Sequence, residues 1–167
     1  MAAEIFFSAN GPSPTTAAQV PVTTGTAIKT LLQIATPATV GIRVIEWGIS
    51  FDGSAAATPI RCELVDTATV AATVTAHVAA GVVAHNTPTG PASLMTLGTT
   101  ATGYTATAEG TITATRMGDV QFVSPTSSYL KQFPLGREFE VAVSRFLRIR
   151  VTAAAAVNAY CYIVWEE

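Results

Sequence analysis

The stretch RVIEWGISFDG, residues 43–53, alternates apolar and polar or small residues, and this pattern constrains the fold most strongly. Ile45, Trp47, Ile49 and Phe51 share one parity, and none of the residues between them is large and apolar. Successive side chains of a β-strand point to opposite faces, so a period of two predicts a strand with one buried and one solvated face. A helix would need apolar residues every three or four positions.

The same alternation recurs in RFLRIRVT, residues 145–152, where Arg148 and Arg150 fall on the face opposite the apolar one, and in VNAYCYIVWEE, residues 157–167. Several short segments of this kind, separated by turn residues, predict an antiparallel sandwich or barrel. The side chains expected to share the core are Ile45, Trp47, Ile49, Phe51, Ile149, Val151, Ile163 and Trp165.

Two hairpins are expected along the chain. PIRCELVD, residues 59–66, should pair with the strand at 43–53 across a long loop, and GTITATRMGDVQFV, residues 110–123, should turn near Gly118. Cys62 and Cys161 fall on strand positions, where free cysteines are commonly buried. Whether they form a disulfide stays open, because this requires adjacent Cβ atoms.

Residues 1–25 begin with the short apolar segment EIFFS and continue into ANGPSPTTAAQ, where Gly and Pro disfavour regular structure. This segment is either an edge strand of its own sheet or an arm that reaches a neighbouring subunit. We expect an N-terminal arm and linker, in which Ile5, Phe6 and Phe7 contact another chain. Residues 26–167 are expected to form a single domain.

The segment at 67–108 has no formally charged residue and is rich in Ala, Thr, Gly and Pro. We expect a long, loop-rich excursion with one or two short strands. An uncharged surface of this length would be adhesive on a free monomer, so we expect much of it at subunit contacts. The interface candidates in this segment are Val82, Val83, Leu94, Met95 and Tyr104.

Charged residues make up 12% of the chain, about half the ~25% that is usual in a soluble domain, and the net charge is −2. This composition lacks the basic face that nucleic acid binding requires. The uncharged segment is too weakly apolar to predict a membrane span. The start of the chain has no basic region followed by a long apolar run, so we expect synthesis in a host cytoplasm without export.

No cluster of residues predicts catalysis, a metal site or a cofactor, and we expect a protein that is not an enzyme. His77 and His85 could form a metal pair, but no Asp, Glu or Cys lies between them, so solvated loop side chains are expected. Tyr160 and Tyr162 lie on the outward parity of the last strand, where they could stack against sugars or pair across strands.

Two parts of the chain resemble small virion proteins of tailed bacteriophages. They are residues 26–66, with EWGISFDG at 46–53, and residues 129–167, with FPLGRE at 133–138. These parts resemble the capsid decoration, or cement, family of minor capsid proteins. The resemblance covers about half the chain. None of these motifs is catalytic.

The resemblance implies an all-β protein, an antiparallel, jelly-roll-like β-sandwich that binds the major capsid protein on the exterior of the virion. It also implies a homotrimer. The alternative function is a receptor- or glycan-binding module of a tail or fibre, which would use Tyr104, Tyr160 or Tyr162.

Overall fold

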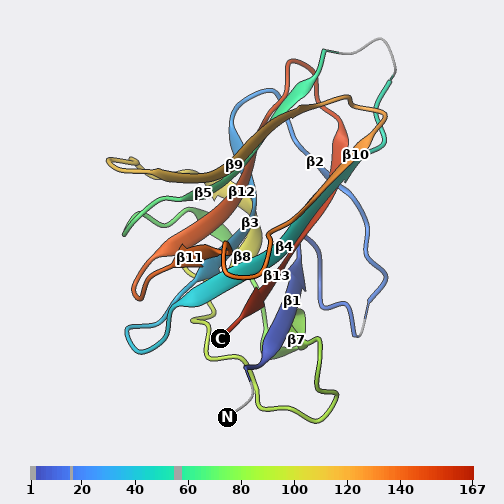
Figure 1. Cartoon of the computed structure of the whole chain (residues 1–167). Coiled ribbons are helices and arrows are strands. Elements are labelled where there is room, and N and C mark those ends of the chain that lie inside the picture. Colours follow the sequence, from blue (N-terminus) through green and yellow to red (C-terminus); the bar gives the residue numbers. More distant parts are fainter. Residues whose placement is uncertain (1–2, 16, 55–57) are drawn as a thin grey trace.

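The structure is a computed structural model that describes residues 3–15, 17–54 and 58–167. Its strands form two antiparallel sheets packed as a β-sandwich, which confirms the expected fold class (Figure 1). The jelly-roll part of that expectation stays a prediction. Helical structure in the described ranges is limited to one 3₁₀ turn, η1 (Ala79–Gly81), and no described helix is long enough to cross a membrane.

Sheet A forms one layer of the sandwich. Its main strands, in spatial order, are β10 (Ser128–Gln132), β4 (Ile42–Phe51), β13 (Asn158–Glu166), β1 (Ile5–Ala9) and β7 (Val83–Ala84). Two short strands join this sheet, β11 (Phe139–Val141) beside β4 and β2 (Val22–Thr23) beside β13.

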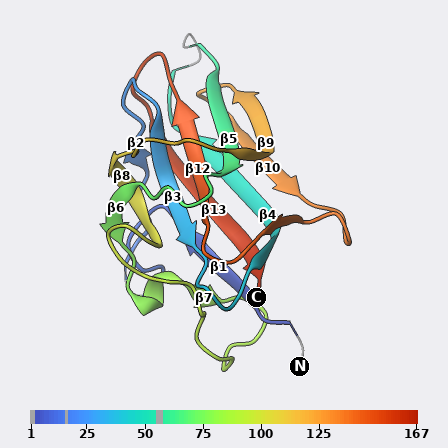
Figure 2. The same ribbon diagram turned by 90° about the vertical axis from the view of Figure 1, so that its left-hand side faces the viewer.

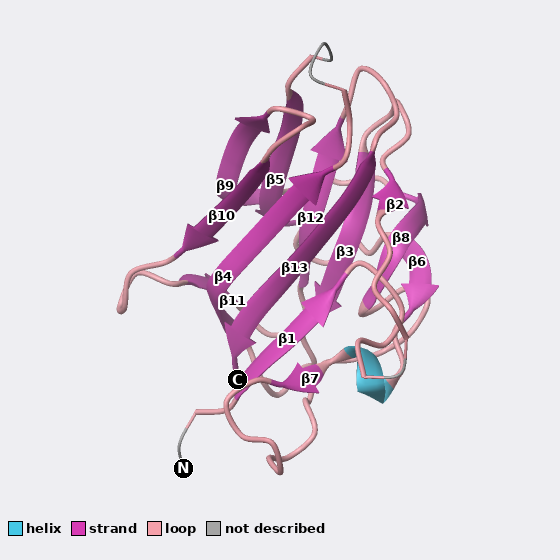
Figure 3. Cartoon of the chain, turned by 90° about the vertical axis from the view of Figure 1, so that its right-hand side faces the viewer, coloured by secondary structure: helices cyan, strands magenta, loops and turns pink. Residues whose placement is uncertain are grey.

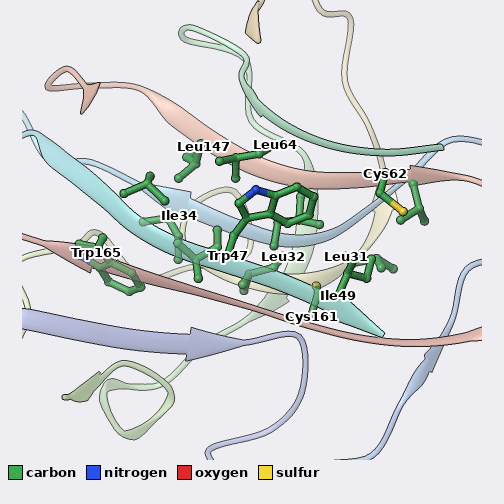
Figure 4. Packing of buried hydrophobic residues seen from close by; sticks show 14 of the residues in the cluster. Leu31, Leu32, Ile34, Trp47, Ile49, Cys62, Leu64, Leu147, Cys161 and Trp165 are labelled. Atoms are coloured by element: carbon green, nitrogen blue, oxygen red, sulfur yellow. The ribbon is translucent and has the colours of Figure 1, made fainter. Parts of the chain in front are cut away.

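Sheet B forms the second layer. Its strands, in spatial order, are β6 (Thr73–Ala76), β8 (Gly103–Ala108), β3 (Lys29–Ala35), β12 (Phe146–Thr152), β5 (Ile60–Asp66) and β9 (Arg116–Val123). The core lies between the inner faces of the two sheets, as the close-up of its apolar side chains shows (Figure 4).

Both tryptophans belong to this core and are fully buried. Ile49, Ile149, Val151 and Ile163 are buried with them, and Phe51 packs against the cluster while remaining partly exposed. The alternating pattern therefore locates most of the core without knowledge of the strand pairing.

Ile45 is the exception among the core candidates, and the prediction that it faces the core is wrong. Val164 on β13 pairs with Glu46, but the next residue, Trp165, pairs with Val44, which leaves Ile45 as an extra residue on β4. Such a β-bulge reverses the parity of the strand beyond it. Val44 is therefore fully buried, whereas Ile45 is partly exposed.

The two expected hairpins do not form. β5 does not pair with β4 but lies in the opposite sheet between β12 and β9, so these two consecutive strands belong to different layers. Gly118 does not lie in a turn but within β9, which runs from Arg116 to Val123 along the edge of sheet B.

The N-terminal segment is not an arm. β1 pairs with β13 over its whole length, from Ile5 opposite Glu166 to Ala9 opposite Tyr162, and also with β7. The side chain of Phe6 is 2% exposed and its ring centroid lies 6.2 Å from that of Trp165. Residues 5–9 are thus a strand of their own sheet, as the alternative held, but an internal strand between β13 and β7 rather than an edge strand.

The outer face of sheet B is partly covered by the chain at the two ends of the uncharged segment, around Val70 and Glu109 (Figure 2). Arg148 lies under this cover and is fully buried, although the alternation places it on the face away from the core. Its guanidinium donates to the carbonyls of Val70 and Glu109, the latter at 3.0 Å, and lies 3.4 Å from the Glu109 carboxylate. Burial lowers the pKa of Arg148 to about 10. These contacts fasten both ends of the excursion to the sheet.

Candidate interaction surfaces

The structure divides the N-terminal interface candidates between the two faces of sheet A. Phe6 is a core residue, so its assignment to an interface is wrong. Ile5 and Phe7 lie on the outer face and are half-buried. The ring of Phe7 stacks on Tyr162, with centroids 5.5 Å apart, and on His85.

The candidates from the uncharged segment are divided in the same way. Val82 and Met95 are buried in the core, so their assignment to an interface is wrong. Tyr104 packs against the core but remains partly exposed, and its assignment to an interface stays a prediction. The side chains of Val82 and Met95 point inward because the uncharged segment packs over one margin of the sandwich, where burial of apolar side chains stabilises it. Val83 is half-buried in β7, and Leu94 is 59% exposed.

Large exposed apolar side chains also occur where the sequence did not predict them. Phe122 is 72% exposed, and Val120 and Met117 lie with it on the outer face of β9. The alternation of Val120 and Phe122 could have shown a half-exposed strand, but the expected turn at Gly118 obscured it. Edge strands rarely present large apolar side chains to solvent unless another molecule covers them.

β9 carries one protection against strand addition. The amide N–H of Val120 donates to its neighbour's carboxylate, Asp119 Oδ1, at 2.9 Å, and is not free to pair with a foreign strand. The apolar side chains that a partner would contact at this edge are those of Met117, Val120 and Phe122.

A second exposed apolar group lies on the turn between β10 and β11. Leu135 is 98% exposed at its tip. The Arg137 amide donates to the Pro134 carbonyl at 2.9 Å, and Gly136 adopts a φ of +78°, which closes a tight turn. The Glu138 carboxylate accepts the Gly136 amide at 3.0 Å, and the backbone amides of Glu138 and Gly136 lower the pKa of Glu138. The leucine is thus presented on an ordered support.

A hollow of about 760 Å³ opens at the end of the sandwich where β5 and β13 end and β4 begins. Asp66 is buried in it, with Oδ2 3.7 Å from Arg116 Nη2 and 3.6 Å from Arg145 Nη1. Arg43 pairs with Glu140 at 3.5 Å. Because each arginine already faces a carboxylate, the hollow lacks the excess positive charge that a phosphate group would need.

The two histidines occupy different environments. His77 is buried, which corrects the expectation of a solvated side chain; its Nε2 lies 3.0 Å from the Ala9 carbonyl and 3.2 Å from Ser8 Oγ. His85 is exposed. Within the described ranges, no group of three or more His, Cys, Asp or Glu side chains is arranged to hold a metal ion.

Both cysteines are buried and free. Cys62 lies on β5 and Cys161 on β13, on the inner faces of opposite sheets. Burial raises the pKa of Cys62 to about 12 and that of Cys161 well above its usual value. Neither thiol is therefore suited to act as a nucleophile.

Comparison of the chain with protein-family models, curated proteins and solved structures gave no match.

Proposed function

We propose that this protein is a structural virion protein that decorates and stabilises the exterior of a bacteriophage capsid by binding the major capsid protein. One observation carries the proposal: large apolar side chains are exposed on ordered strands and turns, above all Phe122 on β9 and Leu135 on the turn after β10. The resemblance of residues 26–66 and 129–167 to decoration proteins supports the same function.

An apolar side chain binds a partner more favourably when the backbone that carries it is already ordered. A flexible loop loses backbone conformational entropy when it binds, whereas the backbone of a strand or a closed turn has already lost most of it. Large apolar anchors that enter a pocket on the partner commonly supply most of the binding energy of an interface. Phe122 and Leu135 are the side chains best placed for this role.

A decoration protein also needs many weak contacts to act together. In the proposed homotrimer, three copies of each anchor bind at once, which raises the apparent affinity through effective concentration. The exposed apolar residues of the uncharged segment, Val78, Leu94 and Leu97, are the proposed contacts between subunits.

The test uses capsid shells of the encoding phage that lack this protein. Purified protein is mixed with the shells, and bound protein is measured after sedimentation. Phe122→Ser and Leu135→Ser should each reduce binding about tenfold or more, in line with the loss of an interface anchor. Val20→Ser is the control, because Val20 is also a large exposed apolar residue, at 58% exposure, but is distant in sequence from both anchors.

Wild-type protein that fails to sediment with the shells would contradict the proposal. Binding that persists in the Phe122→Ser, Leu135→Ser double variant would show that these anchors are not the contact. The alternative function, a receptor- or glycan-binding module of a tail or fibre, predicts no binding to the shells.

A further inference from the structure

The outer face of sheet A carries a small hollow of about 130 Å³ between β10, β4 and β13, the three strands at the front of Figure 3. Ser50 on β4 lies opposite both Tyr160 on β13 and Ser128 on β10, and the next outward row places Gly48 between Tyr162 and Leu130. The central strand thus carries two small residues that are flanked by Tyr160, Tyr162 and Leu130, and this difference in size creates the hollow.

The ring of Tyr162 forms a fixed wall of the hollow. It lies so close over Gly48 that a Cβ atom there would be 2.6 Å from the ring. Its hydroxyl donates to Glu46 Oε1, and Gln132 donates to Glu46 Oε2 at 2.6 Å. Both oxygens of the Glu46 carboxylate therefore already have partners. Tyr162 is held in place by the contact of its ring with Gly48 and by the hydrogen bond of its hydroxyl with Glu46.

The hydroxyl of Tyr129, which also lines the hollow, donates to Asp119 Oδ2 at 2.8 Å, but three other hydroxyls of the hollow form no hydrogen bond with the described residues. Within the described part of the chain, the hydroxyls of Ser50, Ser128 and Tyr160 have no hydrogen-bond partner. Each hydroxyl can both donate and accept, which is the hydrogen-bonding character of another hydroxyl group. No charged side chain lines the hollow.

We infer that this hollow binds an uncharged sugar residue of a glycan. Sugar hydroxyls would pair with the three free hydroxyls, and the apolar face of the ring would lie against Tyr160, Tyr162 or Leu130, which is 57% exposed. An ionic ligand would find no opposite charge in the hollow. An apolar side chain would leave three hydroxyls without water or a partner, which is costly. The inference does not depend on where the protein lies in the virion.

The test is calorimetric titration of the full-length protein with three neutral probes, maltohexaose, cellohexaose and chitohexaose. We expect at least one of them to bind. Tyr160→Phe, which removes only the hydroxyl, should weaken binding about three- to tenfold, the usual effect of one hydrogen bond. Tyr160→Ala should weaken it further, and Ser128→Leu, which fills the hollow from an exposed edge position, should abolish it.

Thr152→Val is the matched control, because it removes a hydroxyl from an exposed strand position on sheet B. It should bind as wild type does. Thermal unfolding of each variant checks that the fold persists, and Ser128→Leu keeps the test decisive if Tyr160→Ala unfolds. The inference is overturned if no probe binds at concentrations up to about 10 mM, or if Ser128→Leu binds with unchanged affinity.

Discussion

Val44 and Ile45 are adjacent β-branched residues on β4, yet only Val44 is fully buried, because the bulge opposite Val164 and Trp165 shifts the parity of the strand. The Ile45 carbonyl remains paired, since the Phe133 amide, just after β10, donates to it at 2.9 Å. The bulge is therefore part of the sheet. Substitutions at Val44 and Ile45 should differ in their effect on the free energy of unfolding.

Substitution of each residue by Thr tests the bulge. Val44→Thr buries a hydroxyl in the core and should lower the free energy of unfolding by about 1–3 kcal/mol. Ile45→Thr should change it by only about 0.5 kcal/mol, the size typical of surface positions. Urea unfolding of the two variants measures the difference. A larger loss for Ile45→Thr than for Val44→Thr would contradict the observed register.

His77 should make stability depend on pH. Burial lowers the pKa of His77 below its usual 6.5, so the unfolded chain binds a proton more readily than the folded chain. Its stabilising contribution is complete above about pH 6.5 and decreases as the pH falls through the lowered value. The free energy of unfolding of the wild type should therefore decline in this window.

His77→Gln is the comparison for this effect, because it keeps a side-chain donor for the Ala9 carbonyl but does not titrate. The difference between the two pH profiles isolates His77 from the carboxylates, which titrate in both proteins. Parallel profiles between about pH 7 and pH 5 would show that His77 does not contribute.

β1 is the element whose contribution to the stability of the domain differs most from the sequence prediction. It lies between β13 and β7, and Phe6 inserts into the core beside Trp165. Deletion of residues 1–12 should therefore destabilise the isolated domain strongly or prevent folding, rather than weaken assembly alone. Circular dichroism with thermal melting measures this, and deletion of residues 1–3 is the control. A truncated protein that melts as wild type does would instead favour a detachable arm.

Single strands were predictable from the sequence, whereas their partners were not. The alternation at 43–53 and 145–152 located β4 and β12, because it depends only on which faces are buried. β5 lies in a different layer from β4, the strand before it, and the burial of Arg148 depends on Val70 and Glu109, both distant in sequence. Contacts between residues this far apart cannot be predicted from the pattern of neighbouring residues in the sequence.

The candidate site was harder to predict than the core for a related reason. The uncharged segment indicated apolar surface, but the pattern could not separate Met95, which anchors the segment to the core, from Leu94, which is exposed. Phe122 and Leu135 were missed because exposure of an apolar residue depends on the position of its strand or turn in the whole fold.

At the scale of the whole molecule, exposed apolar residues of the uncharged segment should hold the proposed trimer together. Val78 is 65% exposed, so a charge there is tolerated by the monomer but would be buried without a partner in a trimer. Val78→Asp and Leu94→Asp should shift the mass measured by light scattering from trimer to monomer. Val20→Asp, on a different exposed loop, should leave it unchanged. A monomeric wild type would contradict this assembly.

The proposed function is tested most directly by the copy number of this protein in purified virions. A decoration protein occupies equivalent sites over the whole shell, so quantitative mass spectrometry should find copies comparable in number to the major capsid protein. A receptor-binding module occupies only the tail or its fibres. A copy number far below that of the major capsid protein, matching instead the tail proteins, would contradict capsid decoration.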